Sequence, residues 1–278
     1  MMGKPRIAVH KFASCDGCQL AFLNMGPELL ELANHVEIVH FVEAGMVAPD
    51  AEVDIAFVEG SVSTEEDIER IHAIRKLSKQ VITIGACAGS GGLQALRNLA
   101  DGEQWLNELY PQPQYIQSLN NTHPVKNYIK VDFEVWGCPV NTEQIKQVVT
   151  SLLQGASPLQ SKDKLCLECK RQQRVCTLVV APAAGVSSEK NENQQTACLG
   201  PITAAGCGAL CPSVGRACYG CYGLADNAES AALARRFEGL GLVSKAIAQK
   251  LLLFHSHEEA LRQAAENTAE TQEASNGQ

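Results

Sequence analysis

The feature that most constrains this chain is its set of twelve cysteines, spread unevenly along 278 residues. Four stand far apart in the first half, at Cys15, Cys18, Cys87 and Cys138. The other eight crowd together as Cys166, Cys169, Cys176, Cys198, Cys207, Cys211, Cys218 and Cys221. Every cysteine can be placed in a set of four, and four thiolates are what a cubane iron-sulfur cluster requires. The pattern therefore predicts a relay of redox centres.

Disulfides and zinc are the competing uses of so many cysteines. Disulfide frameworks belong to small secreted chains that lack a core, whereas this chain has 278 residues and is 45% hydrophobic. Zinc ribbons use C-x2-C pairs such as Cys15 and Cys18, but they bring both pairs close together in sequence. Cys87 and Cys138 instead stand alone, each near glycine after an expected strand. Iron-sulfur ligation therefore fits better than either alternative.

Charge and hydropathy exclude several classes of partner. The net charge is −8 and only 19% of residues are charged, so there is no basic patch for nucleic acid or for a membrane surface. No apolar run reaches the length of a membrane span. Residues 1–12 have neither a long apolar segment nor a twin-arginine pair. We expect a cytoplasmic protein without membrane insertion, in the reducing compartment where thiolate clusters persist.

Strand-like and helix-like stretches alternate over the first part of the chain. Strands are expected at residues 6–10, 35–42, 53–59, 81–84 and 131–135. Helices are expected at residues 19–32 with a break near Gly26-Pro27, at 63–77, from about 93 to 100, and at 142–153. This alternation predicts a doubly wound α/β domain with a parallel sheet.

The character of the sequence changes near residue 155, so we expect three parts. Residues 1–154 form the α/β domain, interrupted by a long excursion over residues 101–130. Residues 155–257 are dense in Cys, Gly and Pro before helical periodicity returns at 225–254, which predicts a smaller, mostly irregular or helical domain. Metal ligation would supply the stability that a large core otherwise provides there. The polar tail, residues 258–278, is expected to be disordered.

The first four cysteines are expected to meet at one edge of the sheet. In an open parallel sheet, ligands collect outside the carboxyl ends of the strands. Cys15 and Cys18 follow the first expected strand, Cys87 follows the strand at 81–84, and Cys138 follows the last one. Glycines between and beside these cysteines allow the backbone to approach a bulky cluster.

Several other residues near that edge have two possible roles. Glu59 ends an expected strand, and it either caps a nearby amide or organises the interface around the first cluster. Trp136 is expected to pack as a lid over the edge of the cluster. The histidines His10, His72 and His255 are expected to be surface or packing residues rather than ligands, because no cluster lacks a fourth cysteine.

Five motifs together resemble the small, electron-transferring subunit of nickel-iron hydrogenases. They are Ser14-Cys-Asp-Gly-Cys18, Val58-Glu-Gly-Ser61, Gly85-Ala-Cys-Ala-Gly-Ser-Gly-Gly92, Gly137-Cys-Pro139 and Cys198-Leu-Gly-Pro-Ile-Thr-Ala-Ala-Gly-Cys207. The resemblance covers about residues 6–223. It implies a flavodoxin-like domain with a proximal 4Fe-4S cluster on Cys15, Cys18, Cys87 and Cys138.

The same resemblance implies two further 4Fe-4S clusters in the second domain. The distal cluster would lie on Cys166, Cys169, Cys176 and Cys198, and the medial cluster on Cys207, Cys211, Cys218 and Cys221. In ferredoxin-like runs the last cysteine of a C-x3-C-P segment ligates the other cluster, and Cys207 to Pro212 has that form. An exchange between the two sets therefore stays open.

Two departures from the exported, respiratory branch of the family are informative. Those proteins have a histidine at the position that matches Cys166 and a proline at the one that matches Cys211. Cysteines at both positions imply three 4Fe-4S clusters with low and similar potentials. The chain is therefore most similar to the cytoplasmic sulfhydrogenase or bidirectional group.

The resemblance also implies partners. The chain has no R-x-C-G-x-C and no D-P-C-x-x-C motif, which hold nickel and iron in the large subunit, so no catalytic residue is expected here. A large subunit would carry the nickel-iron site, and a flavin/NAD(P) reductase or a ferredoxin-like subunit would exchange electrons. The alternative is an iron-sulfur subunit of another redox complex, complex I-like or heterodisulfide-reductase-linked. The complex I subunit, however, has an adjacent Cys-Cys pair where this chain has Cys15-Asp-Gly-Cys18.

Overall fold

A computed structural model describes residues 4–161, 163–179 and 197–276, with side chains through residue 270. The chain divides into two compact units, Met1–Leu159 and Gln160–Gln278. The second unit thus begins at residue 160, whereas the sequence placed its start at residue 155. The segment between α6 (Thr142–Leu153) and the second unit has no regular structure, which is why the local pattern could not mark the boundary more closely.

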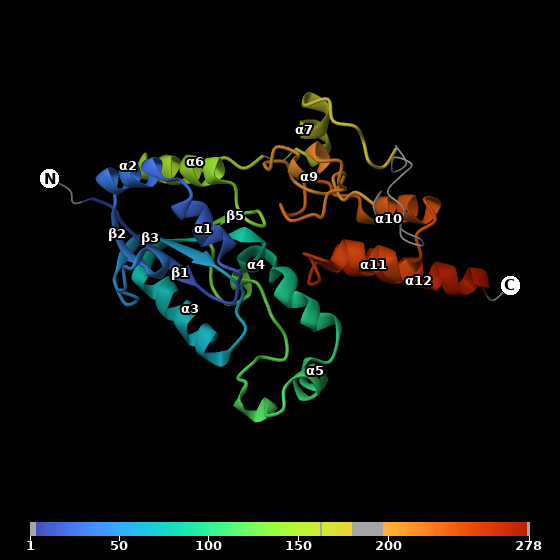
Figure 1. Ribbon diagram of the computed structural model, residues 1–278, viewed down its shortest axis with the longest axis horizontal. Helices are drawn as coiled ribbons and strands as arrows, with labels where there is room; N and C mark the ends of the chain where they lie inside the picture. Colours follow the sequence, from blue (N-terminus) through green and yellow to red (C-terminus); the bar gives the residue numbers. More distant parts are fainter. Residues whose placement is uncertain (1–3, 162, 180–196, 277–278) are drawn as a thin grey trace. The chain divides into compact units, whose positions relative to one another are not determined.

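The first unit is built on a parallel sheet of five strands in the order β2-β1-β3-β4-β5 (Figure 1). The strands are β1 (Arg6–Lys11), β2 (Glu37–Phe41), β3 (Val53–Glu59), β4 (Ser78–Ile84) and β5 (Phe133–Val135). Each neighbouring pair is parallel. This is the flavodoxin-like order of a doubly wound sheet, and it confirms the α/β fold expected from the sequence.

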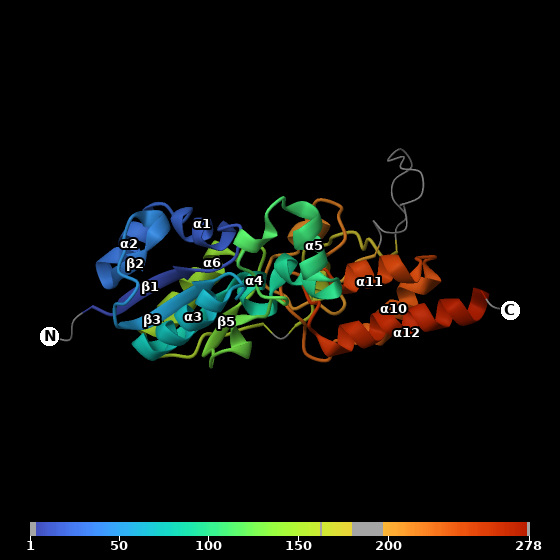
Figure 2. The same cartoon turned by 90° about the horizontal axis from the view of Figure 1, so that it is seen from below.

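Helices cover both faces of this sheet (Figure 2). One face packs against α1 (Gly17–Leu23), α2 (Pro27–His35) and α6 (Thr142–Leu153), and the other against α3 (Glu65–Leu77) and α4 (Gly85–Ser90). The side chains of β3 alternate between the two cores, with Phe57 in the first and Val58 in the second. Burial on both faces explains why the strands are continuous apolar runs.

Local chemistry accounts for most helix boundaries in this unit. Thr64 and Asp67 form a reciprocal capping box at the start of α3. Gly26, with φ +59°, separates α1 from α2, and Pro27 begins the second helix, so the expected break is a complete one. Short 3-10 helices add η1 (Val42–Ala44), η3 (Pro113–Tyr115) and η4 (Val125–Asn127).

Two segments of the first unit differ from the expectation. Residues 85–90, expected as a loop, form α4, and the helix expected after them is the 3-10 helix η2 (Gly92–Leu99). Gly91, with φ +76°, ends α4 and prevents one continuous helix. The excursion at residues 101–130 also contains α5 (Gly102–Leu109), which Asp101 caps.

The second unit is helical around irregular loops. Its helices are α7 (Leu165–Arg171), α9 (Leu210–Ser213), α10 (Ser230–Gly239), α11 (Ser244–Leu252) and α12 (Glu259–Asn276). The last helix packs against α10 and α11 (Figure 1). The core joins Leu199 from a loop to Phe237, Ile247, Leu251 and Leu261 from these helices. None of the helices within residues 4–161, 163–179 and 197–276 has both the length and the apolar character of a membrane span.

The expectation of a disordered tail from residue 258 was wrong. Leu261, Ala264, Ala265 and Thr268 are buried at the spacing of one helical face. Composition hid this face, because most of the remaining residues of α12 are polar. The periodic stretch at 225–254 is likewise two helices, with Gly241 at φ +83° between them.

Candidate functional site

The four cysteines of the first unit follow the carboxyl ends of strands of the sheet. Cys15 and Cys18 lie in the segment that leads from β1 into α1, and Cys87 lies in α4 directly after β4. Cys138 follows β5. Asp16, between the first two cysteines, has φ +64°, a strained conformation for a residue other than glycine. The loop is therefore held in shape by its surroundings.

The thiols of this edge interact with one another electrostatically. Burial, followed by the charges of Cys138 and Cys15, raises the pKa of Cys87 to about 12. Burial, Glu59 and the charges of Cys87 and Cys138 also raise the pKa of Cys18. Four thiolates cannot share such a low-dielectric site without a compensating positive charge. A bound metal would supply that charge, because a thiol that coordinates a metal is deprotonated.

Glycines give these thiols room. A Cβ on Gly85 would overlap the Sγ of Cys18, and one on Gly92 would lie 2.8 Å from the Sγ of Cys87. A Cβ on Gly17 would lie 3.3 Å from the Sγ of Cys15. The backbone therefore comes as close to the sulfurs as glycine permits, and this cradle fits a four-thiolate cluster.

Glu59 connects the end of β3 to the start of α1. Its side chain is 2% exposed, and its two carboxylate oxygens accept hydrogen bonds from the backbone N–H groups of Cys18 (2.9 Å) and Gln19 (3.3 Å). Burial raises its pKa, and these hydrogen bonds lower it. Glu59 therefore caps the helix that carries Cys18. A role at a subunit interface stays a prediction.

Gln94 and Trp136 lie next to the first cysteine site, where one forms hydrogen bonds and the other fills space. Gln94 accepts a hydrogen bond from the Sγ of Cys87 (3.3 Å) and donates one to the carbonyl of Ala13. Trp136 is 7% exposed, and its ring fills the space beside Gly89, where a Cβ would lie 2.9 Å away. Of the histidines that were not expected to be ligands, His10 and His255 are buried and His72 is exposed.

The structure brings one set of four cysteines together around α7. Cys166 and Cys169 lie on this helix, Cys176 follows it, and Cys198 approaches from a distant segment. A Cβ on Gly200 would lie 3.4 Å from the Sγ of Cys198 and 3.5 Å from that of Cys166. Burial, followed by the charges of Cys166, Cys198 and Cys176, raises the pKa of Cys169 to about 11.

The last four cysteines lie in two segments that also reach Cys198. Cys207 and Cys211 lie just before and in α9, and Cys218 and Cys221 lie in the loop after it. Cys207 and Cys211 interact with each other, as do Cys218 and Cys221. The N–H of Cys218 donates to the Sγ of Cys198 (3.2 Å). Cys198 therefore lies between the two sets expected from the sequence, so these contacts do not decide the division of the eight ligands.

Glu168 is a structural residue of this unit that sequence reasoning missed. Its carboxylate accepts hydrogen bonds from the N–H groups of Gly206 (2.9 Å) and Ala209 (3.1 Å). Glu168 thus joins α7 by hydrogen bonds to the segment that contains Cys207 and leads into α9. Ala209 has φ +53°, so this loop is also held in a strained conformation. No local signal marks Glu168, because its partners lie about forty residues away in sequence.

The cysteine sets differ from a site for a single metal ion. In the described part of the chain, no three His, Cys, Asp or Glu side chains are close enough to share one metal ion. A cubane cluster needs a different arrangement, because its four thiolates bind several irons rather than one ion.

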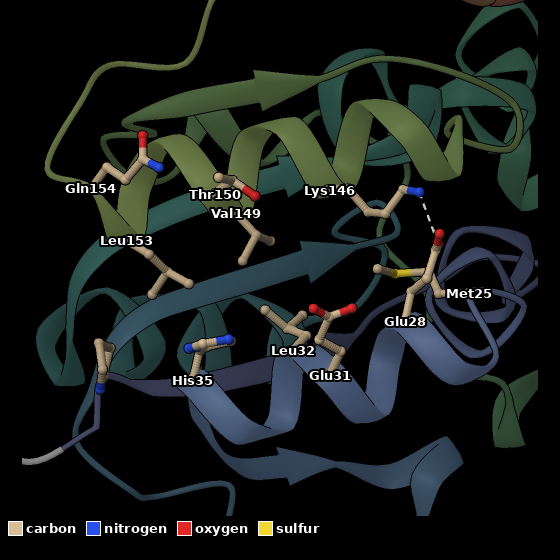
Figure 3. A pocket seen from close by; sticks show the side chains of 11 residues that line it. Met25, Glu28, Glu31, Leu32, His35, Lys146, Val149, Thr150, Leu153 and Gln154 are labelled. Carbon is tan, nitrogen blue, oxygen red and sulfur yellow. Dashed lines mark hydrogen bonds and ion pairs between the residues drawn. The ribbon is translucent and has the colours of Figure 1, made fainter.

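A groove of about 620 Å³ lies between α2 and α6, where Lys146 bridges to Glu28 (Figure 3). Its lining contains none of the cysteines.

Comparisons with known proteins agree with this arrangement. Residues 15–152 match the family model described as NADH ubiquinone oxidoreductase, 20 Kd subunit. The delta subunit of sulfhydrogenase 2 from Pyrococcus furiosus is 33% identical over 78% of this chain and 86% of the relative. One subunit of the vhu F420-non-reducing hydrogenase from Methanococcus voltae is 31% identical over 92% of this chain and 95% of the relative.

The chain is also similar to a hydrogenase subunit of known structure. A subunit in the crystal structure of an NAD+-reducing [NiFe]-hydrogenase in the H2-reduced state is 30% identical to this chain, with a TM-score of 0.53. The match covers 56% of this chain and 95% of that one. The chain belongs to the family of hydrogenase small subunits, in the group that contains the sulfhydrogenases and the bidirectional enzymes. It is a component of a hydrogenase complex.

Proposed function

We propose that this chain relays electrons through three 4Fe-4S clusters between the nickel-iron site of a large subunit and an electron-accepting partner. The observation that carries the proposal is the gathering of the cysteines, four at the sheet edge of the first unit and eight in the second. A bound 4Fe-4S cluster supplies one-electron redox chemistry. This chain supplies the thiolates, the exclusion of water and the hydrogen bonds.

The proximal cluster is assigned to Cys15, Cys18, Cys87 and Cys138 of the domain at residues 1–154. The distal cluster is assigned to Cys166, Cys169, Cys176 and Cys198, and the medial cluster to Cys207, Cys211, Cys218 and Cys221, in the domain at residues 155–257. The contacts of Cys166 with Cys198 around Gly200 support the distal set.

Backbone N–H groups aimed at sulfur support a role in tuning the clusters. The N–H of Gly220 lies 3.3 Å from the Sγ of Cys218, and the N–H of Cys218 donates to Cys198. Such hydrogen bonds stabilise the thiolate form and raise the reduction potential of the cluster that it ligates. Burial of Cys18, Cys198 and Cys218 keeps water from the sulfurs.

Partners follow from the relatives. Their names include NAD-reducing and F420-non-reducing hydrogenases. We therefore assign a flavin/NAD(P) reductase or a ferredoxin-like subunit as the electron acceptor of a cytoplasmic enzyme. No residue of this chain is assigned to hydrogen cleavage.

Anaerobic purification of the native complex, followed by metal analysis and identification of its subunits, tests the proposal. We expect about twelve irons per copy of this chain and nickel on a co-purifying large subunit. About four irons per chain would refute the three clusters. A cysteine-to-serine series on the second unit, read by iron content and EPR, would assign each ligand to its cluster.

The second candidate is an iron-sulfur subunit of a different redox complex, complex I-like or heterodisulfide-reductase-linked. The match of residues 15–152 to the NADH ubiquinone oxidoreductase family favours it. That match ends before the second unit begins, so it does not explain the eight cysteines there. A purified complex without nickel would favour this second candidate.

A further inference from the structure

Lys250 is a cation of the second unit that faces the cysteines. It lies near the end of α11, and its ammonium nitrogen lies 4.1 Å from the centroid of the Tyr219 ring. Tyr219 stands between Cys218 and Cys221, so the cation is held against a loop that carries two ligands. A cation over an aromatic face is stabilised by the ring, more so when both are shielded from water.

The charge of Lys250 reaches three of the thiols. Burial lowers the pKa of Lys250, and the charges of Cys198, Cys218 and Cys211 raise it. Two of these three cysteines belong to the medial set, and one belongs to the distal set. The contact with Tyr219 places Lys250 beside the loop of the proposed medial cluster, and the interaction with Cys198 places it at the boundary with the distal one.

The surrounding structure fixes this position. Ile247 and Leu251, on the same helix, are fully buried in the core of the unit. Just beyond the helix, the Nε2 of His255 lies 2.7 Å from the carbonyl oxygen of Gly220, in the same loop as Tyr219. The core anchors the helix on either side of Lys250, and His255 joins the chain just beyond it to the cysteine loop, so the ammonium group is held in place.

We propose that Lys250 raises the reduction potential of the cluster held by Cys207, Cys211, Cys218 and Cys221 by placing a positive charge beside its thiolates. Reduction adds one electron, and so one negative charge, to the cluster. A nearby cation stabilises the reduced form more than the oxidised form. Lys250 is thus a positioning residue that adjusts the middle step of the relay. This inference rests on the proposed function.

The test is a redox titration of the anaerobically purified complex, followed by EPR. Lys250→Met is expected to lower the potential of one cluster by about 59 mV, a tenfold change in its reduction equilibrium for one electron. Lys250→Arg keeps the charge and is expected to keep the potential. Lys245→Met is the matched control, because Lys245 lies on the same helix but is exposed.

The iron content distinguishes a failure of the inference about Lys250 from a failure of the proposed function. If Lys250→Met retains about twelve irons and its cluster potentials do not change, the role of Lys250 is overturned. The proposal of three clusters is then unaffected. An equal shift in Lys245→Met would also overturn it, because any nearby charge would then suffice. If Lys250→Met loses iron, Lys250→Gln replaces it, and loss of iron in both would show a structural role instead. A wild-type complex with about four irons would refute the proposed function itself.

Discussion

The first unit carries its cysteines at the edge of a sheet, whereas the second unit has cysteines inside its core. The cores on the two faces of the sheet contain Cys18 alone among the cysteines. The core of the second unit contains Cys198 and Cys218, and Cys169 and Cys207 pack against it. We therefore expect metal ligation to be an addition to a self-sufficient fold in the first unit, and a condition of folding for the cysteine loops of the second.

Removal of iron is expected to have the largest effect, and to affect the two units differently. After anaerobic chelation, we expect the amides of β1, β3 and β4 to stay protected from hydrogen exchange. Exchange in the loops at residues 197–221 should rise by roughly two orders of magnitude, as for a loss of about 3 kcal/mol of local stability. Equal loosening of both units would show that the sheet also depends on its cluster.

A substitution of Gly85 tests whether the first cluster can be lost while the clusters of the second unit remain. Gly85→Ala places a Cβ on the Sγ of Cys18, and we expect iron to fall from about twelve to about eight per chain, with the clusters of the second unit retained. Gly45→Ala is the control, because Gly45 has a similar φ of +81° but no atom within 4 Å of the new Cβ. Iron loss in the control would mean that backbone strain, rather than the clash, removes the cluster.

We expect the stability of the sheet to depend on pH whether or not iron is bound. Burial, with the charges of His40 and Arg70, lowers the pKa of His10 to about 3, whereas the unfolded value is 6.5. The unfolded chain therefore binds a proton that the folded chain rejects. Stability is fully present above pH 6.5 and is lost as the pH falls, by about 1.4 kcal/mol per pH unit.

Urea unfolding of the iron-free chain between pH 7 and pH 5, followed by hydrogen exchange in β1, measures this loss. His10→Gln removes the titrating group and should flatten the dependence. A variant with the slope of the wild type would assign the effect to other groups.

Substitution of the carboxylate at the sheet edge has the smallest expected effect. Glu59→Gln keeps one oxygen acceptor for the N–H groups of Cys18 and Gln19, so we expect a loss of about 1 kcal/mol in the stability of α1. Thermal unfolding and hydrogen exchange in α1 measure it. If the variant leaves electron transfer and subunit association unchanged, Glu59 is a cap and not an organiser of the interface.

Local sequence predicted the first unit well because its strands are short apolar runs separated by helices with recognisable caps. The Thr64 capping box and the Gly26-Pro27 break are examples of such local signals. The 3-10 form of η2 was missed, because the choice between α and 3-10 hydrogen bonding depends on packing. The helix α12 was missed because its few apolar residues become buried only when the helix packs against α10 and α11.

Local sequence patterns were enough to predict the parallel α/β class. They also predicted that Cys15, Cys18, Cys87 and Cys138 gather, because parallel strands end at one edge. The remaining contacts depend on how distant segments pack. In the tertiary structure Cys198 lies between the two later sets, Glu168 of α7 accepts hydrogen bonds from a loop about forty residues away, and Lys250 of α11 lies over Tyr219. Each of these contacts involves a loop without periodic structure, so its position follows from long-range packing rather than from any local pattern.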